Sequence, residues 1–222
     1  MNWEFDSLYD YEDDVFELEN QQDLSYFRVF HASPNARKVD ILANNVVIAE
    51  NLDYKEFTQY VSAYPGRYSI KVFQAGLRRN PLIDAEINTT PRGIYTLAIA
   101  GREEDISLLT IPETEIRAQP RMLHLRFCHL SPNTPRVDIK TNEGRVLFRN
   151  VGFKEFTEYL TLDPGNYDLE VYIASTNRRI LSIPNIRLRR NRRYTIYAVG
   201  LRGRHQDTPL EVVISLDGGS YL

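Results

Sequence analysis

The chain has 222 residues, of which 42% are hydrophobic and 26% charged, and its formal net charge is −3. This composition is typical of a globular protein and argues against a disordered or fibrous chain. No segment approaches the roughly 18 consecutive apolar residues that cross a bilayer, so we expect no membrane span. The length suits two small domains, each with its own core.

The chain begins with a strongly acidic segment. Residues 1–25 hold nine carboxylates and neither Lys nor Arg, whereas residues 121–222 hold 16 basic and 10 acidic side chains. This tail also carries aromatic residues, among them Trp3, Tyr9 and Tyr11. It contains no basic segment followed by an apolar one, so we predict a cytoplasmic protein. Deposition on a spore surface, or display on a cell surface if a signal has been removed, remain alternatives.

Short strands follow the tail. Apolar and polar residues alternate along residues 67–72, as in a strand with one buried face. Pro65-Gly66 and Asn44-Asn45 are turn signals between such segments. We place strands at about 26–32, 37–42, 46–49, 57–62, 67–74, 81–87, 94–101 and 105–111, with counterparts downstream. Seven or eight strands in about 90 residues indicate a β-sandwich.

The sequence contains an internal repeat. Residues 27–41 match residues 125–139, and three later blocks match segments 99 positions further on. The residues that recur in the first block are Arg28/Arg126, His31/His129, Ser33/Ser131 and Asp40/Asp138. We therefore predict an all-β protein of two tandem immunoglobulin-like antiparallel β-sandwich domains. The predicted organisation is a tail over 1–25, a first repeat over 26–113, a linker over 114–122 and a second repeat over 123–222.

The segments RVFHASPNARKVDI and PGRYSIKV resemble those of a bacterial family, the domain of unknown function 4397. The resemblance extends over both repeats, nearly all of residues 26–216. It implies a β-sandwich, usually in exported or cell-surface proteins, with no established activity. By analogy, a second expected role is that of a component of an intracellular structural assembly such as a spore coat layer.

His31, Ser33 and Asp40, with their copies in the second repeat, are residue types found in hydrolases. Strand parity places both histidines on the core-facing side, which predicts buried rings satisfied by the backbone instead of exposed catalytic bases. No Gly-x-Ser-x-Gly elbow supports catalysis either. We hypothesise that the Arg28–Asp40 and Arg126–Asp138 couples bridge neighbouring strands and fix their register.

We predict no catalytic, metal or cofactor site. The single cysteine, Cys128, excludes an internal disulfide and a thiolate cluster. His124 and His129 are five positions apart on an extended strand and project to opposite faces, and no spacing fits the usual zinc patterns. No glycine-rich phosphate loop is followed by a helix.

A run of arginines in a hairpin of the second repeat is the most distinctive charged feature. It comprises Arg187, Arg189, Arg190, Arg192 and Arg193. Such a run is often only a solvated loop. It could instead bind an anionic polymer, although a pI near 5.9 and the lack of interleaved aromatics argue against nucleic acid. It could also receive the acidic tail, within one chain or from a neighbour, and we favour this interpretation.

The sequence thus favours a non-enzymatic structural or interaction protein. It would assemble with itself or with a cell-envelope or spore-coat component through the tail, the basic loops and strand edges. The first alternative is a carbohydrate-binding module, for which Tyr60, Tyr172 and Tyr197 are candidate contact residues if they form an exposed row. The second is a hydrolase with a cleft between the repeats, which no motif indicates.

Overall fold

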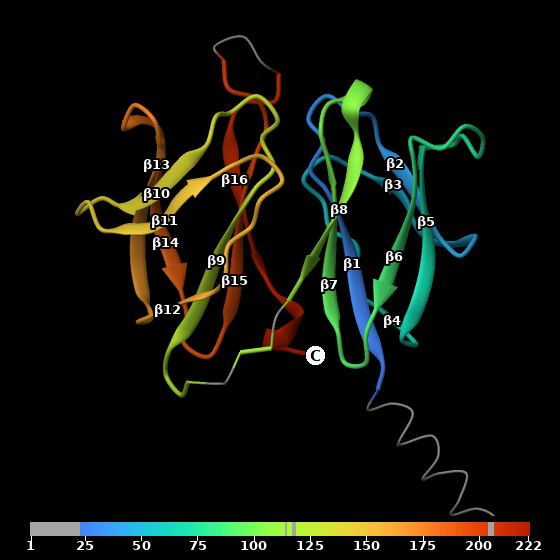
Figure 1. Cartoon of the computed structure of the whole chain (residues 1–222), viewed down its shortest axis with the longest axis horizontal. Coiled ribbons are helices and arrows are strands. Elements are labelled where there is room, and N and C mark those ends of the chain that lie inside the picture. Colours follow the sequence, from blue (N-terminus) through green and yellow to red (C-terminus); the bar gives the residue numbers. More distant parts are fainter. Residues whose placement is uncertain (1–22, 114, 117–118, 204–206) are drawn as a thin grey trace, which may run out of the picture.

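The computed structural model describes residues 23–113, 115–116, 119–203 and 207–222 (Figure 1). Most of the acidic tail, with Trp3, Tyr9 and Tyr11, lies outside the described residues. Over the described residues the protein consists of sixteen strands and two short 3-10 helices, so the predicted all-β class is confirmed. No helix in this part of the chain is long and apolar enough to cross a membrane.

The first sandwich contains eight strands and one 3-10 helix. Their bounds are β1 (Ser25–His31), β2 (Val39–Ala43), β3 (Val46–Leu52), β4 (Val61–Ala63), β5 (Gly66–Gln74), β6 (Ile83–Thr89), β7 (Ile94–Ala100), η1 (Glu103–Asp105) and β8 (Ser107–Pro112). They form two sheets, one with the order β4-β1-β7-β8 and one with the order β3-β2-β5-β6. Each predicted strand corresponds to one of these elements.

The second sandwich repeats this arrangement. Its elements are β9 (Leu123–His129), β10 (Val137–Thr141), β11 (Val146–Val151), β12 (Leu160–Leu162), β13 (Gly165–Ile173), β14 (Arg178–Leu188), β15 (Arg193–Val199), β16 (Glu211–Leu216) and η2 (Gly218–Ser220). The sheets have the orders β12-β9-β15-β16 and β11-β10-β13-β14. The prediction of two tandem sandwiches is therefore confirmed.

One feature departs from a purely antiparallel sandwich. β1 pairs with β7 in parallel, and β9 pairs with β15 in the same way. The chain therefore enters β1 at the end of the sandwich where β6 turns into β7. The corresponding end of the second sandwich carries the turn from β14 to β15, and Figure 1 shows both turns at the lower end of the molecule.

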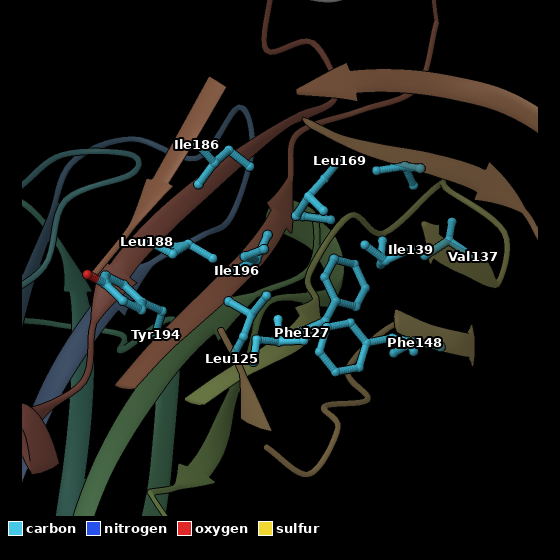
Figure 2. Close-up of a cluster of buried hydrophobic side chains, with 14 of the residues drawn as sticks. Leu125, Phe127, Val137, Ile139, Phe148, Leu169, Ile186, Leu188, Tyr194 and Ile196 are labelled. Carbon is cyan, nitrogen blue, oxygen red and sulfur yellow. The ribbon is translucent and has the colours of Figure 1, made fainter. Parts of the chain in front are cut away.

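Each sandwich has its own apolar core between its two sheets. In the second sandwich, Phe127 of β9 packs against Phe148 of β11, with ring centroids 6.4 Å apart, and Leu169 and Ile196 complete the cluster (Figure 2). These side chains come from alternate positions of their strands, as a half-buried strand requires. The first sandwich has an equivalent cluster that includes Phe27.

A third apolar cluster joins the two sandwiches. The sheets that contain β1 and β9 face each other, so the molecule has four β layers (Figure 1). Every residue of β9 is buried, because one face of the strand covers its own core and the other covers the neighbouring sandwich. The faces of β1 and β9 that sequence alternation assigns to solvent are therefore buried.

Large and small side chains exchange places across this cluster. Phe30 of β1 corresponds to Cys128 of β9, whereas Ala98 of β7 corresponds to Tyr197 of β15. The Phe30 and Tyr197 rings lie 4.9 Å apart. Each repeat has a small side chain at the position where the other has a large one. The two copies therefore complement one another and fill the shared core closely.

Candidate functional site

Each repeat contains an equivalent set of four interacting residues, an Arg, a Thr, a Tyr and an acid, here called a quartet. In the second repeat, Arg126 Nε donates to Thr195 Oγ1 at 2.7 Å, and Thr195 Oγ1 donates to Asp217 Oδ2 at 2.6 Å. The Tyr159 hydroxyl donates to the same carboxylate oxygen at 2.5 Å. The Arg126 guanidinium also lies over the Tyr159 ring, 4.6 Å from its centroid, so it makes a cation–π contact.

The first repeat forms the equivalent quartet. Arg28 Nε donates to Thr96 Oγ1 at 3.0 Å, and Thr96 Oγ1 donates to Glu113 Oε1 at 3.3 Å. The Tyr60 hydroxyl donates to the same Glu113 oxygen. The Arg28 guanidinium lies 4.8 Å from the centroid of the Tyr60 ring. The duplication therefore preserves a constellation contributed by four separate segments of each repeat.

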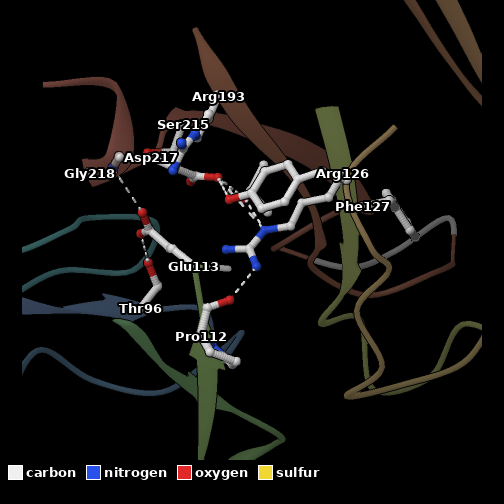
Figure 3. A network of polar contacts seen from close by, with 12 residues as sticks. Thr96, Pro112, Glu113, Arg126, Phe127, Arg193, Ser215, Asp217 and Gly218 are labelled. Carbon is white, nitrogen blue, oxygen red and sulfur yellow. Dashed lines mark hydrogen bonds and ion pairs between the residues drawn. The ribbon is translucent and has the colours of Figure 1, made fainter. Parts of the chain in front are cut away.

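The two quartets meet at the interface between the sandwiches, and Figure 3 shows Thr96 and Glu113 of one near Arg126 and Asp217 of the other. Arg28 Nη1 donates to Ser215 Oγ at 2.8 Å and to the carbonyl of Leu216 at 3.1 Å. In return, Arg126 Nη1 donates to the carbonyl of Pro112 at 2.6 Å. Leu216 and Pro112 hold equivalent register positions, opposite Tyr194 and Tyr95 in the adjacent strands. The interface thus resembles that of a two-fold symmetric homodimer.

The charges in this network are enclosed. The exposed fraction of Arg126 is 1% and that of Asp217 is 0%. Asp217 lies 3.3 Å from Arg28 Nη2 and 3.7 Å from Arg126 Nε, and so pairs with both cations. Burial raises the pKa of Glu113, as does the nearby Asp217 charge, whereas the hydrogen bond from Tyr60 opposes the shift. An enclosed, largely satisfied network is suited to joining the sandwiches.

The hypothesis that Arg28 pairs with Asp40, and Arg126 with Asp138, is wrong. Each arginine belongs to the sheet that faces the other sandwich, whereas each aspartate belongs to the opposite sheet of its own sandwich. The polar faces of the two sheets of a sandwich point in opposite directions, so these side chains diverge. Both arginines pair with Asp217 instead, Arg28 across the interface and Arg126 within its own repeat.

The two aspartates hold backbone in place. Asp40 Oδ1 accepts from the amide of Asn51 at 2.9 Å, and Asp40 Oδ2 accepts from the amide of Gly76 at 3.0 Å. Asp138 Oδ1 accepts from the amide of Asn150 at 2.8 Å. Asn51 and Asn150 both have positive φ. The repeated Val-Asp motif therefore fixes an irregular point in β3 and in β11, where the ladder with the neighbouring strand shifts register.

The histidines and serines of the repeated motif are buried. His31 Nε2 lies 3.1 Å from the carbonyl of Arg37, and His129 Nε2 lies 3.2 Å from that of Pro135, so one nitrogen of each ring has a backbone partner. His31 Nδ1 has no partner among the described residues, so the predicted satisfaction by the backbone is only partial in the first repeat. Burial lowers the pKa of both histidines. Ser33 and Ser131 hydroxyls each donate to a glycine carbonyl, at 2.6 Å in both repeats. No serine–histidine pair oriented for nucleophilic attack results.

The arginine run lies on the turn from β14 to β15 and borders a depression of the described surface. This depression has a volume of about 820 Å³ and is lined by Pro164, Gly165, Asn166, Asn185, Arg187, Leu188, Arg189, Arg190 and Arg192. We call it the arginine surface. Its four arginines are exposed. Arg193 is half-buried and points elsewhere, donating to the carbonyl of Ile116 at 3.2 Å.

The arginine surface is a property of the second repeat alone. Arg189 N donates to the Tyr194 hydroxyl at 3.2 Å, and Thr90 N donates to the Tyr95 hydroxyl at 3.1 Å, so the two turns have the same local structure. The residues of the first repeat that correspond to Arg187, Arg189, Arg190 and Arg192 are Asn88, Thr90, Pro91 and Gly93. The fold does not require arginine at these positions, since the first turn forms without it.

The described residues contain no cluster of three or more His, Cys, Asp or Glu side chains that could hold a metal ion. The sequence profile of the family described as "Domain of unknown function (DUF4397)" matches residues 25–140 and 123–217. The chain belongs to the DUF4397 family. Among curated proteins no relative matches it.

Solved structures similar to this DUF4397 protein include a carbohydrate-binding module. It is CBMbc, of family CBM26, from Eubacterium rectale Amy13K in complex with maltoheptaose, with 11% identity and a TM-score of 0.27. The match covers 86% of this chain and 96% of that one. The Bacillus anthracis TIE protein matches with 11% identity and a TM-score of 0.25, over 87% of this chain and 44% of its own. These values are too low to assign a function.

Most of the quartet residues of this DUF4397 protein do not stand out in the sequence alone. Two of the matched blocks nevertheless contain the tyrosines and threonines of both quartets, because Tyr60 matches Tyr159 and Thr96 matches Thr195. A polar residue that recurs in both copies of a strand is the available signal. Glu113 and Asp217 fall after the last matched block and carry no such signal.

Proposed function

We propose that this DUF4397 protein is an interaction protein that binds a polyanionic partner through its arginine surface. The observation that supports this most directly is the gathering of Arg187, Arg189, Arg190 and Arg192 around one open depression. A guanidinium presents a planar fork of donors that matches carboxylate, phosphate or sulfate groups. A partner with several such groups could engage several forks together.

The guanidinium groups of the arginine surface retain donors for a partner. No ion pair joins Arg187, Arg189 or Arg190 to a carboxylate of the described residues. Arg192 uses one nitrogen, Nη1, to donate to the carbonyl of Ser220 at 2.8 Å. Other exposed arginines, among them Arg79 and Arg102, also lack an ion pair with the described residues, so single unpaired arginines are common on this protein. What supports a binding role is that unpaired arginines gather around one depression.

The neighbouring residues favour an anionic polymer over other ligands. No aromatic side chain lines the depression, so the stacking that single-stranded nucleic acids use is lacking there. Of the three tyrosines considered for sugar contacts, Tyr197 is fully buried and Tyr60 lies in the inter-sandwich network. Only Tyr172 lies outside it, where its hydroxyl donates to Glu170. An exposed aromatic row for a neutral sugar is therefore not formed by these residues.

The test is binding of fluorescently labelled poly-L-glutamate, followed by anisotropy at low and at physiological ionic strength. We expect the variant R187Q/R189Q/R190Q to bind at least about tenfold more weakly than the wild type at low salt, and the wild-type affinity to fall as salt rises. The matched control is R79Q/R102Q/R149Q, which removes three exposed arginines elsewhere and the same net charge. Equal loss in both variants would show a nonspecific charge effect and overturn the proposal.

A further inference from the structure

We propose that the acidic N-terminal segment, residues 1–22, binds the arginine surface of its own chain and competes there with an external polyanion. The inference rests on the proposed function, and it adds a specific occupant for the same surface. It is drawn from the charge of the segment, the point where the segment joins the fold and the asymmetry between the repeats.

The segment joins the fold at the end that carries the arginine surface. The carbonyl of Asp23 accepts from the amide of Arg92 at 3.4 Å, and the amide of Tyr26 donates to the carbonyl of Gly93 at 2.8 Å. Asp23 is thus held at the turn from β6 to β7. The turn from β14 to β15 occupies the equivalent place in the second sandwich, and both lie at the same end of the molecule (Figure 1).

The length of the segment suits the distance. For any chain of 22 residues the extended length is about 70 Å, and a random coil of this length has a root-mean-square end-to-end distance of about 25 Å. Stacked sheets lie about 10 Å apart. The distance from the first sandwich to the outer sheet of the second is therefore only a few such spacings. Because the segment is tethered, its effective concentration at the arginine surface is in the millimolar range.

The charges of the two partners are complementary and locally concentrated. Residues 1–22 carry eight carboxylates and no Lys or Arg, namely Glu4, Asp6, Asp10, Glu12, Asp13, Asp14, Glu17 and Glu19. The turn of the first repeat, where the segment is attached, offers only Arg92. The arginines have accumulated on the equivalent turn of the other repeat, which lies within reach of the tether. Tethering favours the segment of the same chain over that of a second copy.

Trp3 provides a direct readout, because it is the only tryptophan of the chain and belongs to the segment. In the full-length wild type we expect Trp3 fluorescence anisotropy to fall by about half between low and high salt, as the charge attraction is screened. In R187Q/R189Q/R190Q it should be low at every salt concentration, whereas R79Q/R102Q/R149Q should behave as the wild type does. Anisotropy unchanged by salt and by the arginine substitutions would overturn the proposal.

The competition is tested in the full chain with E12Q/D13N/D14N/E17Q, which keeps the segment and removes half of its charge. We expect this variant to bind labelled poly-L-glutamate roughly tenfold more tightly than the wild type, because the surface is no longer occupied. Equal affinities would overturn the competition. If neither protein bound poly-L-glutamate, the proposed function would fail, and the Trp3 signal would still decide whether the segment binds.

Light scattering distinguishes binding of the chain's own segment from binding of the segment of a second copy. Binding within one chain predicts a monomer and a Trp3 signal that does not change over a hundredfold range of protein concentration. A Trp3 signal that rises with concentration together with the molar mass, and that R187Q/R189Q/R190Q abolishes, would assign the arginine surface to the segment of a second copy and overturn the proposal in its own-chain form.

Discussion

Arg28 and Arg126 hold the same place in the two repeats and reach in opposite directions across one interface. Arg28 donates to the carbonyl of Leu216, and Arg126 donates to the equivalent carbonyl, that of Pro112. The reciprocity shows that the sandwiches pack as two copies of one surface. Because both cations are buried, the stability of the whole molecule depends on the carboxylate between them.

Replacing Asp217 with Asn should lower the free energy of unfolding by about 3–5 kcal/mol, because two buried guanidinium groups lose the charge that neutralises them. Urea denaturation followed by circular dichroism measures this loss. The matched control is Asp84→Asn, at an exposed position of β6, which should change the value by less than about 0.5 kcal/mol. Similar values for the two variants would contradict the importance of the network.

Tyr197 tests the apolar part of the interface. Its hydroxyl is buried and has no hydrogen-bond partner among the described residues, so Tyr197→Phe should leave the free energy of unfolding unchanged or raise it by about 1 kcal/mol. Tyr197→Ala should lower it by about 3–5 kcal/mol, because a cavity opens beside Phe30. Thermal and urea unfolding measure both. A Phe variant much less stable than the wild type would show that the hydroxyl has a partner.

Stability should fall as the pH drops below about 6.5, the usual histidine pKa. Burial lowers the folded-state pKa of His31 and His129, so the unfolded chain takes up protons that the folded chain excludes. The contribution is fully present above the unfolded pKa and is lost as the pH falls toward the depressed folded values. Urea midpoints between about pH 7.5 and 5.5 measure it.

The double variant His31→Gln/His129→Gln should show a shallower pH dependence over the same range. Some pH dependence should remain in the double variant, because it keeps His124, whose pKa is also lowered by burial and by the positive charge of Arg193. An unchanged slope in the double variant would show that the two repeated histidines do not contribute.

Cys128 should be inert in the folded protein. Burial raises the pKa of its thiol to about 12, and its exposed fraction is 0%. Thiolate, the reactive form, is therefore scarce and inaccessible. We expect labelling by a thiol reagent at least about a hundredfold slower in buffer than in denaturant. A cysteine introduced at the exposed position Ser175 serves as the control and should react rapidly in both conditions.

The positions of the strands along the chain could be predicted from the sequence because they depend on local information. Alternation along residues 67–72 fixes which side chains of β5 enter a core, and the repeated blocks show that the second half folds in the same way. The same parity placed His31 and His129 inside, and the structure confirms it. Such conclusions require only the period of the strand.

The pairing of Arg28 could not be predicted in this way. Parity places its side chain on the face of β1 opposite the core of its own sandwich, but it cannot say whether water or another sheet covers that face. Its partner Asp217 is 189 positions away and belongs to the other repeat. Alternation and repetition along the chain are enough to define two sandwiches and the side chains that fill each core. The packing of one outer face of each sandwich against the other is seen only in the tertiary structure, because it depends on how two finished surfaces fit.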